Sequence, residues 1–232
     1  MKLSRNALKY IAAAAMLVDH IGMFFVPVST PIGCIMRIIG RLTAPIMCMF
    51  LAEGYIHTSS KKKYGLRLLI FAVISQFAYA YSHNITLLTP DFNMIFTLFL
   101  CFIILLCYDK ISNEILKFVA IVACVAVSYF CDWGVIAPMW VLGFYLYRDD
   151  KKKQTLAFSA VSVIHVLMCV IFDVTNGYNW YGLLWQLGVF LFIPLLWLYS
   201  GENGRKTKFS KWFFYVFYPL HLLVLGLIRI FL

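Results

Sequence analysis

Acidic residues are scarce in this chain, and charge of either sign is sparse. Ten Asp and Glu residues stand against 20 Lys and Arg, and charged residues make up 13% of the 232 positions. A soluble domain of this length could not bury the apolar surface of a sequence that is 63% hydrophobic. Together with a mean hydropathy of +0.86, this scarcity excludes an ordinary soluble globular fold and indicates a membrane protein.

The apolar runs lack the in–out alternation of transmembrane β-strands, which excludes a β-barrel. Continuous apolar runs are instead typical of membrane-spanning helices. We therefore expect an all-α polytopic membrane protein, in which residues 1–232 form a single integral membrane domain in contact with lipid.

Short motifs of several enzyme classes are also missing. The chain has no P-loop, no H-E-x-x-H, no G-x-S-x-G and no G-x-G-x-x-G. Its seven cysteines include no C-x-x-C pair and nearly all fall in apolar runs, so reduced core thiols are expected. Metal-ligand spacing is not evident, and no metal is expected. The chemistry that remains is histidine with carboxylate and arginine, which suits proton removal from a nucleophile, anion anchoring or proton-coupled transport.

The lengths of the apolar runs predict about nine membrane-spanning helices, since a span needs roughly 20 apolar residues. The N-terminal run continues past Phe24 and Phe25 and is interrupted where a signal-peptide cleavage site would lie. We therefore interpret it as an uncleaved first span. The predicted segments are residues 7–27, 32–57, 64–82, 93–109, 115–131, 134–147, 155–172, 181–199 and 211–231.

Basic residues alternate between the connections of these helices. The predicted outer connections 28–31, 83–92, 132–133 and 173–180 contain no Lys or Arg. By the positive-inside rule the N-terminus is then cytoplasmic, the C-terminus lies outside, and the protein is a multi-pass protein of the cell membrane. The net charge of +10 is thereby explained without nucleic acid, which is not expected as a partner. The predicted inner segments carry Lys2, Arg5, Lys9, Lys61, Lys62, Lys63, Lys110, Arg148, Lys151, Lys152, Lys153, Arg205, Lys206 and Lys208.

Ionisable residues within the first two spans predict a polar centre at membrane depth. Asp19 and His20 are consecutive, so their side chains point about 100° apart on a helix. We expect Asp19 to meet a cation of another helix while His20 faces another side of the same cavity. Arg37 and Arg41 are four residues apart and share a face. Pro45 leaves the carbonyl of residue 41 without its helical hydrogen bond and predicts a kink there. A charge at this depth costs about 3 kcal/mol, so a functional site is favoured over a structural ion pair.

Polar residues elsewhere are candidates to line the same site. Glu53 lies near the inner end of the second span, and Asn93 opens the fourth. In the last span, Pro219 bends a segment that contains Tyr218 and His221. We expect Glu53, Asn93, Tyr218 and His221 to line the site.

Several of these segments, read together, resemble the TraX family. The resemblance is carried by LKYIAAAAMLVDHIGMFF, RIIGRLTAPIMCMFLAEGYIHTSSKKKYGLRLLIFAVISQ and FYVFYPLHLLVL, in order and spacing. It implies an integral membrane acetyltransferase, similar to bundles of transmembrane acyltransferases that use cytoplasmic acetyl-CoA. The type member acetylates the N-terminus of a pilin subunit. Residue 44 is Ala where the family pattern implies a bulky aromatic. The positions that match the pattern are Asp19, His20, Gly40, Arg41, Pro45, Glu53, Gly54, His57 and His221.

The expected mechanism assigns a role to each part of this centre. His20 acts as general base on an amine or hydroxyl acceptor, which is a peptide, a pilin or a glycan. Asp19 sets the electrostatics, and Arg41 with Arg37 holds phosphate or stabilises the oxyanion. No cofactor other than acetyl-CoA is implied. Its nucleotide phosphates are expected to bind Arg37, Arg41, Lys61, Lys62, Lys63 and Arg67.

Two other functions remain open at this stage. A proton-coupled transporter or channel would use the same charged residues as an ion path. A non-catalytic assembly factor for a surface filament would tolerate replacement of His20. The sequence also leaves open whether the chain forms an oligomer.

Overall fold

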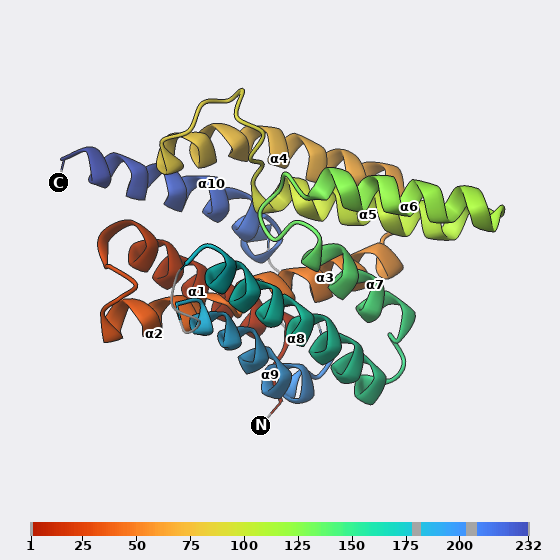
Figure 1. The fold of residues 1–232 in the computed structure, drawn as a ribbon. Helices are drawn as coiled ribbons and strands as arrows, with labels where there is room; N and C mark the ends of the chain where they lie inside the picture. The colour runs from red at the N-terminus through yellow and green to blue at the C-terminus, as the bar shows by residue number, and fades with distance from the viewer. Residues whose placement is uncertain (1, 178–181, 203–207, 232) are drawn as a thin grey trace.

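A computed structural model describes residues 2–177, 182–202 and 208–231. Every regular element in these ranges is helical (Figure 1). The predicted inner residues Arg205 and Lys206 and the end of the predicted outer connection, 178–180, lie outside the described residues. The helices are Arg5–Phe25 (α1), Pro31–Gly40 (α2), Thr43–His57 (α3), Lys61–His83 (α4), Met94–Lys110 (α5), Glu114–Ser128 (α6), Ile136–Leu146 (α7), Lys151–Thr175 (α8), Leu184–Leu191 (η1, a 3₁₀ helix), Phe192–Leu198 (α9) and Lys208–Phe231 (α10).

Side-chain caps start most of the long helices between the apolar runs. The hydroxyl of Ser4 accepts a hydrogen bond from the backbone N–H of Ala7, and the side chain of Asn93 accepts from Ile95 and Phe96. Such caps satisfy backbone donors that have no partner inside the helix. The further N-cap side chains with a backbone bond are Thr30, Ser60, Asn113 and Asp150.

Several helices are long and apolar enough to cross a bilayer, which confirms an all-helical membrane protein. Among the described residues five segments meet that criterion, namely 5–25, 31–57, 61–83, 151–175 and 212–231. Ile136–Leu146 and Leu184–Leu198 are shorter apolar helices. The predicted segment 32–57 is divided into α2 and α3, and the segment 181–199 contains η1 and α9. The count of nine spans and the orientation stay predictions.

The break between α2 and α3 lies where proline chemistry places it. Arg41 and Leu42 separate the two helices, and Pro45 is the third residue of α3. A proline has no backbone N–H and crowds the carbonyl four residues earlier, here that of Arg41. The helix is therefore interrupted at the predicted position, next to Arg41.

Packing brings distant parts of the chain onto α1. This helix contacts α2, α3 and α10, while α4 packs against α10 and α5, and α3 packs against α7 (Figure 1). The turns that follow α3, α5 and α7 lie towards the right of Figure 1, and the α1–α2 turn and the C-terminal end of α10 lie at the left. The N-terminal and C-terminal helices thus share one wall of the structure.

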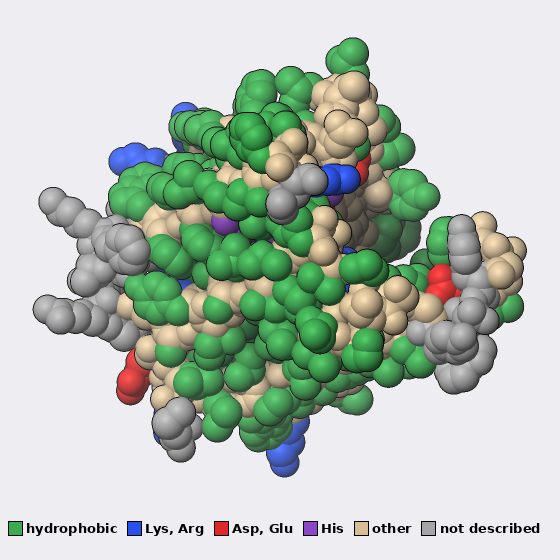
Figure 2. Space-filling view, turned by 90° about the vertical axis from the view of Figure 1, so that its left-hand side faces the viewer, with side chains coloured by type: hydrophobic (Ala, Val, Ile, Leu, Met, Phe, Trp, Pro, Cys, Tyr) green, Lys and Arg blue, Asp and Glu red, His purple; other side chains and the backbone are tan. Residues whose placement is uncertain are grey.

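The outward faces of the long helices are apolar. Phe77 of α4 and Ile171 of α8 are each about 60% exposed, at 59% and 61%. Figure 2 shows that hydrophobic side chains cover most of one end of the molecule, with few charged groups among them. Such a surface is stable in lipid and unfavourable in water.

Candidate functional site

Asp19 binds two arginines of the neighbouring helix. Its Oδ1 accepts a hydrogen bond from Arg37 Nη1 at 2.8 Å, and its Oδ2 accepts one from Arg41 Nη2 at 2.8 Å. The pairing is possible because Gly40 has no side chain, since a Cβ atom there would overlap the Asp19 carboxyl group. The sequence prediction that Asp19 meets a cation of another helix is confirmed.

Two indole rings hold the arginines from the other side. The guanidinium carbon of Arg41 lies 4.8 Å from the ring centre of Trp133 and 4.7 Å from that of Trp185. Arg37 lies 4.5 Å from the same Trp185 ring, and Arg41 Nη1 donates to Gln186 Oε1 at 3.4 Å. Cation–π contacts strengthen when water is excluded. The two guanidinium groups are therefore fixed before any ligand binds.

His20 is oriented by a backbone carbonyl and by a second histidine. Its Nδ1 lies 2.9 Å from the Met16 carbonyl oxygen, which can only accept, so Nδ1 carries the proton of the neutral ring. His221 Nδ1 likewise lies 2.8 Å from the carbonyl oxygen of Phe217. The remaining nitrogen of His221, Nε2, is 3.1 Å from His20 Nδ1 and accepts from it. The basic nitrogen of the pair is then His20 Nε2, which has no hydrogen-bond partner among the described residues.

A third imidazole lies beside this pair. The ring centres of His83 and His20 are 6.4 Å apart, and His83 Nδ1 donates to the carbonyl oxygen of Tyr79 at 2.9 Å. Both His20 and His83 line the same cavity. Three histidines from α1, α4 and α10 thus lie close together, and two of them, His20 and His83, line the cavity.

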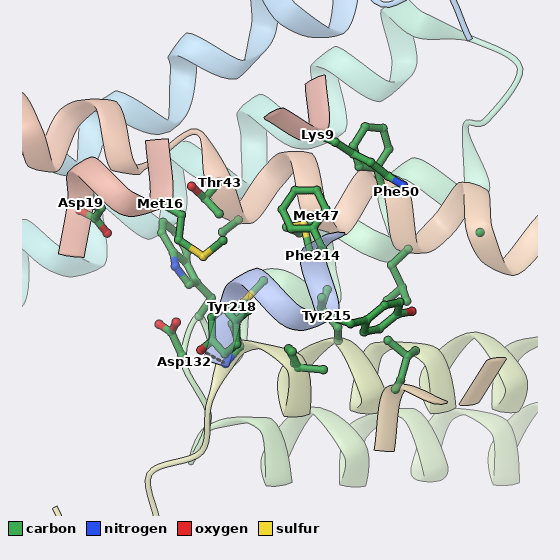
Figure 3. A pocket seen from close by; sticks show the side chains of 18 of the residues that line it. Lys9, Met16, Asp19, Thr43, Met47, Phe50, Asp132, Phe214, Tyr215 and Tyr218 are labelled. Carbon is green, nitrogen blue, oxygen red and sulfur yellow. Dashed lines mark hydrogen bonds between the residues drawn. The ribbon is translucent and has the colours of Figure 1, made fainter. Parts of the chain in front are cut away.

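A cavity of about 640 Å³ connects these groups. Figure 3 shows Asp19 and Asp132 at one side of it, and Lys9 and Phe50 at the other. This volume is within the usual range for a bound organic ligand, about 300–1,000 Å³. Methionine and aromatic side chains line the middle. The basic and imidazole side chains at the end near Lys9 are Arg5, Lys9, His57 and Arg67.

Asp132 is a second carboxylate, besides Asp19, at the end opposite Lys9. It lies in the connection between α6 and α7, where its N–H donates to the Phe92 carbonyl oxygen at 2.7 Å and its own carbonyl accepts from the Thr97 hydroxyl. The next residue, Trp133, has a φ of 59°, a conformation that is rare for a bulky side chain and often marks functional sites. Burial raises the pKa of Asp132 to about 6, so the group is mostly ionised at pH 7.

Only some of the predicted site residues line the cavity. Asp19, His20, Arg37, Arg41, Arg67 and Tyr218 line it, and His221 contacts it through His20.

Five other predicted residues have different surroundings. Glu53 accepts from the Tyr199 hydroxyl at 2.8 Å and faces Arg5 at 3.9 Å. Asn93 caps α5 and donates to Gln76. Lys61 pairs with Asp109 at 3.0 Å, while Lys62 and Lys63 are absent from the cavity lining.

Sequence reasoning did not single out four residues of the site. Asp132 and His83 lie at the ends of predicted spans, where polar side chains are ordinarily solvated. Trp133 and Trp185 are aromatic residues of the kind expected at membrane interfaces. Of these four residues, only Asp132 could have been noticed in the sequence, because it is an acidic residue in a predicted connection of two residues.

The described residues offer no group of three or more His, Cys, Asp or Glu side chains that could hold a metal ion. The arrangement supplies instead a neutral imidazole base, a fixed pair of guanidinium groups and a free carboxylate. These groups can remove a proton from a nucleophile and stabilise negative charge on an oxygen.

The fold and the cavity define a polytopic helical membrane protein with a charged internal site. The family model described as TraX protein matches residues 4–229, and the chain belongs to the TraX family. It is 31% identical over 236 residues to a probable fimbrial assembly protein (FimC, serogroup H1) of Dichelobacter nodosus, covering 97% of this chain and 95% of the relative.

A second relative is an uncharacterised protein of Rickettsia prowazekii, strain Madrid E. It is 26% identical over 188 residues, which cover 75% of this chain and 69% of the relative. No solved structure matches the chain.

Proposed function

We propose that this protein is a membrane-embedded acetyltransferase that moves an acetyl group from acetyl-CoA to an acceptor nucleophile. The observation that carries the proposal is the cavity, which joins a basic end at Arg5, Lys9 and Arg67 to the open Nε2 side of His20. Acetyl-CoA matches these two ends, because it carries a negatively charged nucleotide at one end and a reactive acetyl thioester at the other.

The donor enters at the basic end. Arg67 is held there by the Tyr215 hydroxyl, which accepts from its Nε at 3.0 Å. Its remaining N–H groups form no hydrogen bond with a described residue and can bind phosphate. The uncharged arm of the donor lies among the apolar side chains of the middle, such as Met16 and Met47. With the nine-span topology inferred from the positive-inside rule, this end opens to the cytoplasm and the site lies in the inner membrane.

His20 performs the proton transfer. Its Nε2 takes a proton from the acceptor as the acceptor nitrogen or oxygen attacks the thioester carbonyl. The new C–N or C–O bond forms, the C–S bond breaks, and the thiolate is protonated on leaving. Arg41, held between Asp19 and the indole rings, stabilises the negative charge that develops on the carbonyl oxygen.

Assembly of a surface filament is the second candidate function. Its support is the similarity to the Dichelobacter nodosus protein, which is described as a probable fimbrial assembly protein. The two functions are compatible if the acetyl acceptor is a filament subunit. Only the assembly function applies if the protein binds a filament subunit without acetylating it.

Replacement of His20 tests the proposed chemistry. The full-length protein in lipid nanodiscs is incubated with acetyl-CoA and peptides with a free N-terminus, and released thiol and acetylated product are measured. His20→Ala should reduce turnover by about 10²–10⁴-fold, the usual contribution of a general base, without loss of the folded protein. Lys152→Ala is the control, because that side chain is exposed and lies outside the cavity lining.

Wild-type turnover by His20→Ala would overturn the role of His20. Absence of thioester cleavage by the wild-type protein with peptides, amines and alcohols would overturn the enzymatic proposal. Binding of a filament subunit that is unaffected by His20→Ala would then favour the assembly function, and uptake of solute into vesicles would favour transport.

A further inference from the structure

The Asp132 carboxylate is free although its backbone is fixed. Its main chain is tied to Phe92 and Thr97 by hydrogen bonds at both the N–H and the carbonyl. Neither carboxylate oxygen has a hydrogen bond or an ion pair with any described residue. Figure 3 shows the group directed into the cavity beside Tyr218. A charge held in this way in a partly enclosed space is costly unless a ligand compensates it.

The arginines of the site attract Asp132 from a distance but form no hydrogen bond or ion pair with it. Arg37 and Arg41 direct their terminal nitrogens to the two oxygens of Asp19, at 2.8 Å each. Their aromatic contacts with Trp133 and Trp185 hold them in that position. Asp132 is therefore the carboxylate of this cavity that remains available to a cation from outside.

The two ends of the cavity differ in their charged groups. Arg5, Lys9 and Arg67 line one end, whereas at the other end the carboxylates of Asp19 and Asp132 lie with the guanidinium groups of Arg37 and Arg41. An anionic donor is attracted to the first end. The second end, where the Asp132 carboxylate has no hydrogen bond to a described residue, suits the second substrate, and that carboxylate suits a cation.

We propose that Asp132 binds the ammonium group of a primary-amine acceptor and makes the site select amines over hydroxyl compounds. This rests on the proposed acetyl transfer. An alcohol of the same shape carries no positive charge, so the Asp132 carboxylate attracts it less than the ammonium. The preference for amines over alcohols therefore follows from Asp132.

The step balances with two protons leaving the acceptor nitrogen. The bound ammonium first gives one proton to His20 Nε2, and the neutral amine attacks the thioester carbonyl. The C–N bond forms, the C–S bond breaks, and the second proton passes from nitrogen to the departing thiolate. The products are the acetamide and the free thiol, and the first proton is released from His20 to solvent.

Acceptor competition in the purified full-length protein tests the assignment. Thiol release from acetyl-CoA is followed with hexylamine and with hexanol, in the wild-type protein and in Asp132→Asn. A charge-assisted hydrogen bond is lost in the variant, so kcat/KM for hexylamine should fall by about tenfold to a hundredfold. The kcat/KM for hexanol should change less than twofold. Asp149→Asn, which removes an exposed carboxylate far from the cavity, should change neither.

Thermal stability separates this role from a structural one. An unpaired buried charge destabilises the folded protein, so Asp132→Asn should raise the melting temperature. If Asp132 were a structural counter-ion, the same change would lower it. Asp132→Glu keeps the charge and should keep the preference for hexylamine, which provides a second variant if the amide does not fold.

Direct binding distinguishes failure of this inference from failure of acetyl transfer. Hexylammonium should raise the melting temperature of the wild-type protein and not that of Asp132→Asn, while hexanol treats both alike. Equal hexylamine selectivity in an active wild type and an active Asp132→Asn would overturn the inference alone. Absence of transfer in the wild type would overturn the proposed function, and equal stabilisation of both proteins by hexylammonium would then overturn the inference too.

Discussion

Two histidines of the site differ in what each ring nitrogen contacts. His20 lines the cavity, and its Nε2 has no hydrogen bond to any residue that the structure describes, whereas both nitrogens of His221 have partners within the protein. The carbonyl groups of Met16 and Phe217 decide which nitrogen of each ring carries the proton. His20 is therefore the base in the proposed mechanism, and His221 is a positioning residue that acts through it.

Replacement of His221 should slow the reaction without affecting donor binding. His221→Ala removes the acceptor that stabilises the Nδ1–H of His20, so kcat should fall by about tenfold, the worth of one hydrogen bond. The KM for acetyl-CoA should stay within twofold. His221→Gln, whose amide oxygen can accept the same bond, should recover part of kcat. An unchanged kcat in His221→Ala would contradict the positioning role.

Asp19 and Asp132 show how much of a residue's role depends on its neighbours. The sequence predicted a cationic partner for Asp19, because Arg37 and Arg41 share a helical face one span away. Nothing comparable marked Asp132, since its role depends on the absence of a partner. Such an absence is a property of the surrounding packing and leaves no local pattern in the sequence.

Among the helices, the contact between α1 and α2 depends on one glycine. Gly40 lies against the carboxyl group of Asp19, and the helices could not approach to this distance with a larger residue. Small residues at helix contacts allow such close approach in membranes. Arg37 of α2 and Arg41, which directly follows α2, reach Asp19 for this reason.

Gly40→Ala should therefore disrupt the ion pairs and the helix contact together. The added methyl group displaces the Asp19 carboxylate and leaves the arginines without their partner, at a cost of about 3 kcal/mol or more. We expect a lower melting temperature and loss of acetyl transfer. Gly143→Ala in α7 is the matched control, because its added Cβ would lie 3.3 Å from Ala157 Cβ, where a small shift suffices. Equal melting temperatures for the two variants would contradict the role of Gly40.

The sequence predicted a break between α2 and α3, but it did not predict where the Arg41 side chain lies as a result. Pro45 indicated that the carbonyl of Arg41 loses its helical bond. The position of the Arg41 side chain depends on Trp133 and Trp185, which are over 90 residues away in the chain. Local chemistry determines that a helix is interrupted, and tertiary contacts determine what the interruption exposes.

At the scale of the whole molecule, the cavity has one basic end, lined by Arg5, Lys9 and Arg67. Donor binding should therefore depend on ionic strength, because exposed charges are screened over about 8 Å at 0.15 M salt. Arg67→Gln should raise the KM for acetyl-CoA by about five- to tenfold and weaken its salt dependence, with little change in the KM for the acceptor. Lys152→Gln, at an exposed position outside the cavity, is the control.

An equal increase of both KM values in Arg67→Gln would indicate a general change of structure. No change in the KM for acetyl-CoA would contradict donor entry at this end of the cavity. Kinetics at several salt concentrations, with each variant in the same nanodiscs, provide both comparisons.

The sequence by itself determined that this is a helical membrane protein of the TraX family with Asp19 and two arginines at its centre. Hydropathy, helical spacing and the high free-energy cost of a charge in lipid can all be assessed from the sequence without knowledge of the fold. Only the tertiary structure decided that His20 contacts His221, that Trp133 packs on Arg41, and that Asp132 lines the cavity with no side-chain hydrogen bond to a described residue. Those relations join residues about 90–200 positions apart, and they arise from helix packing, which no local pattern encodes.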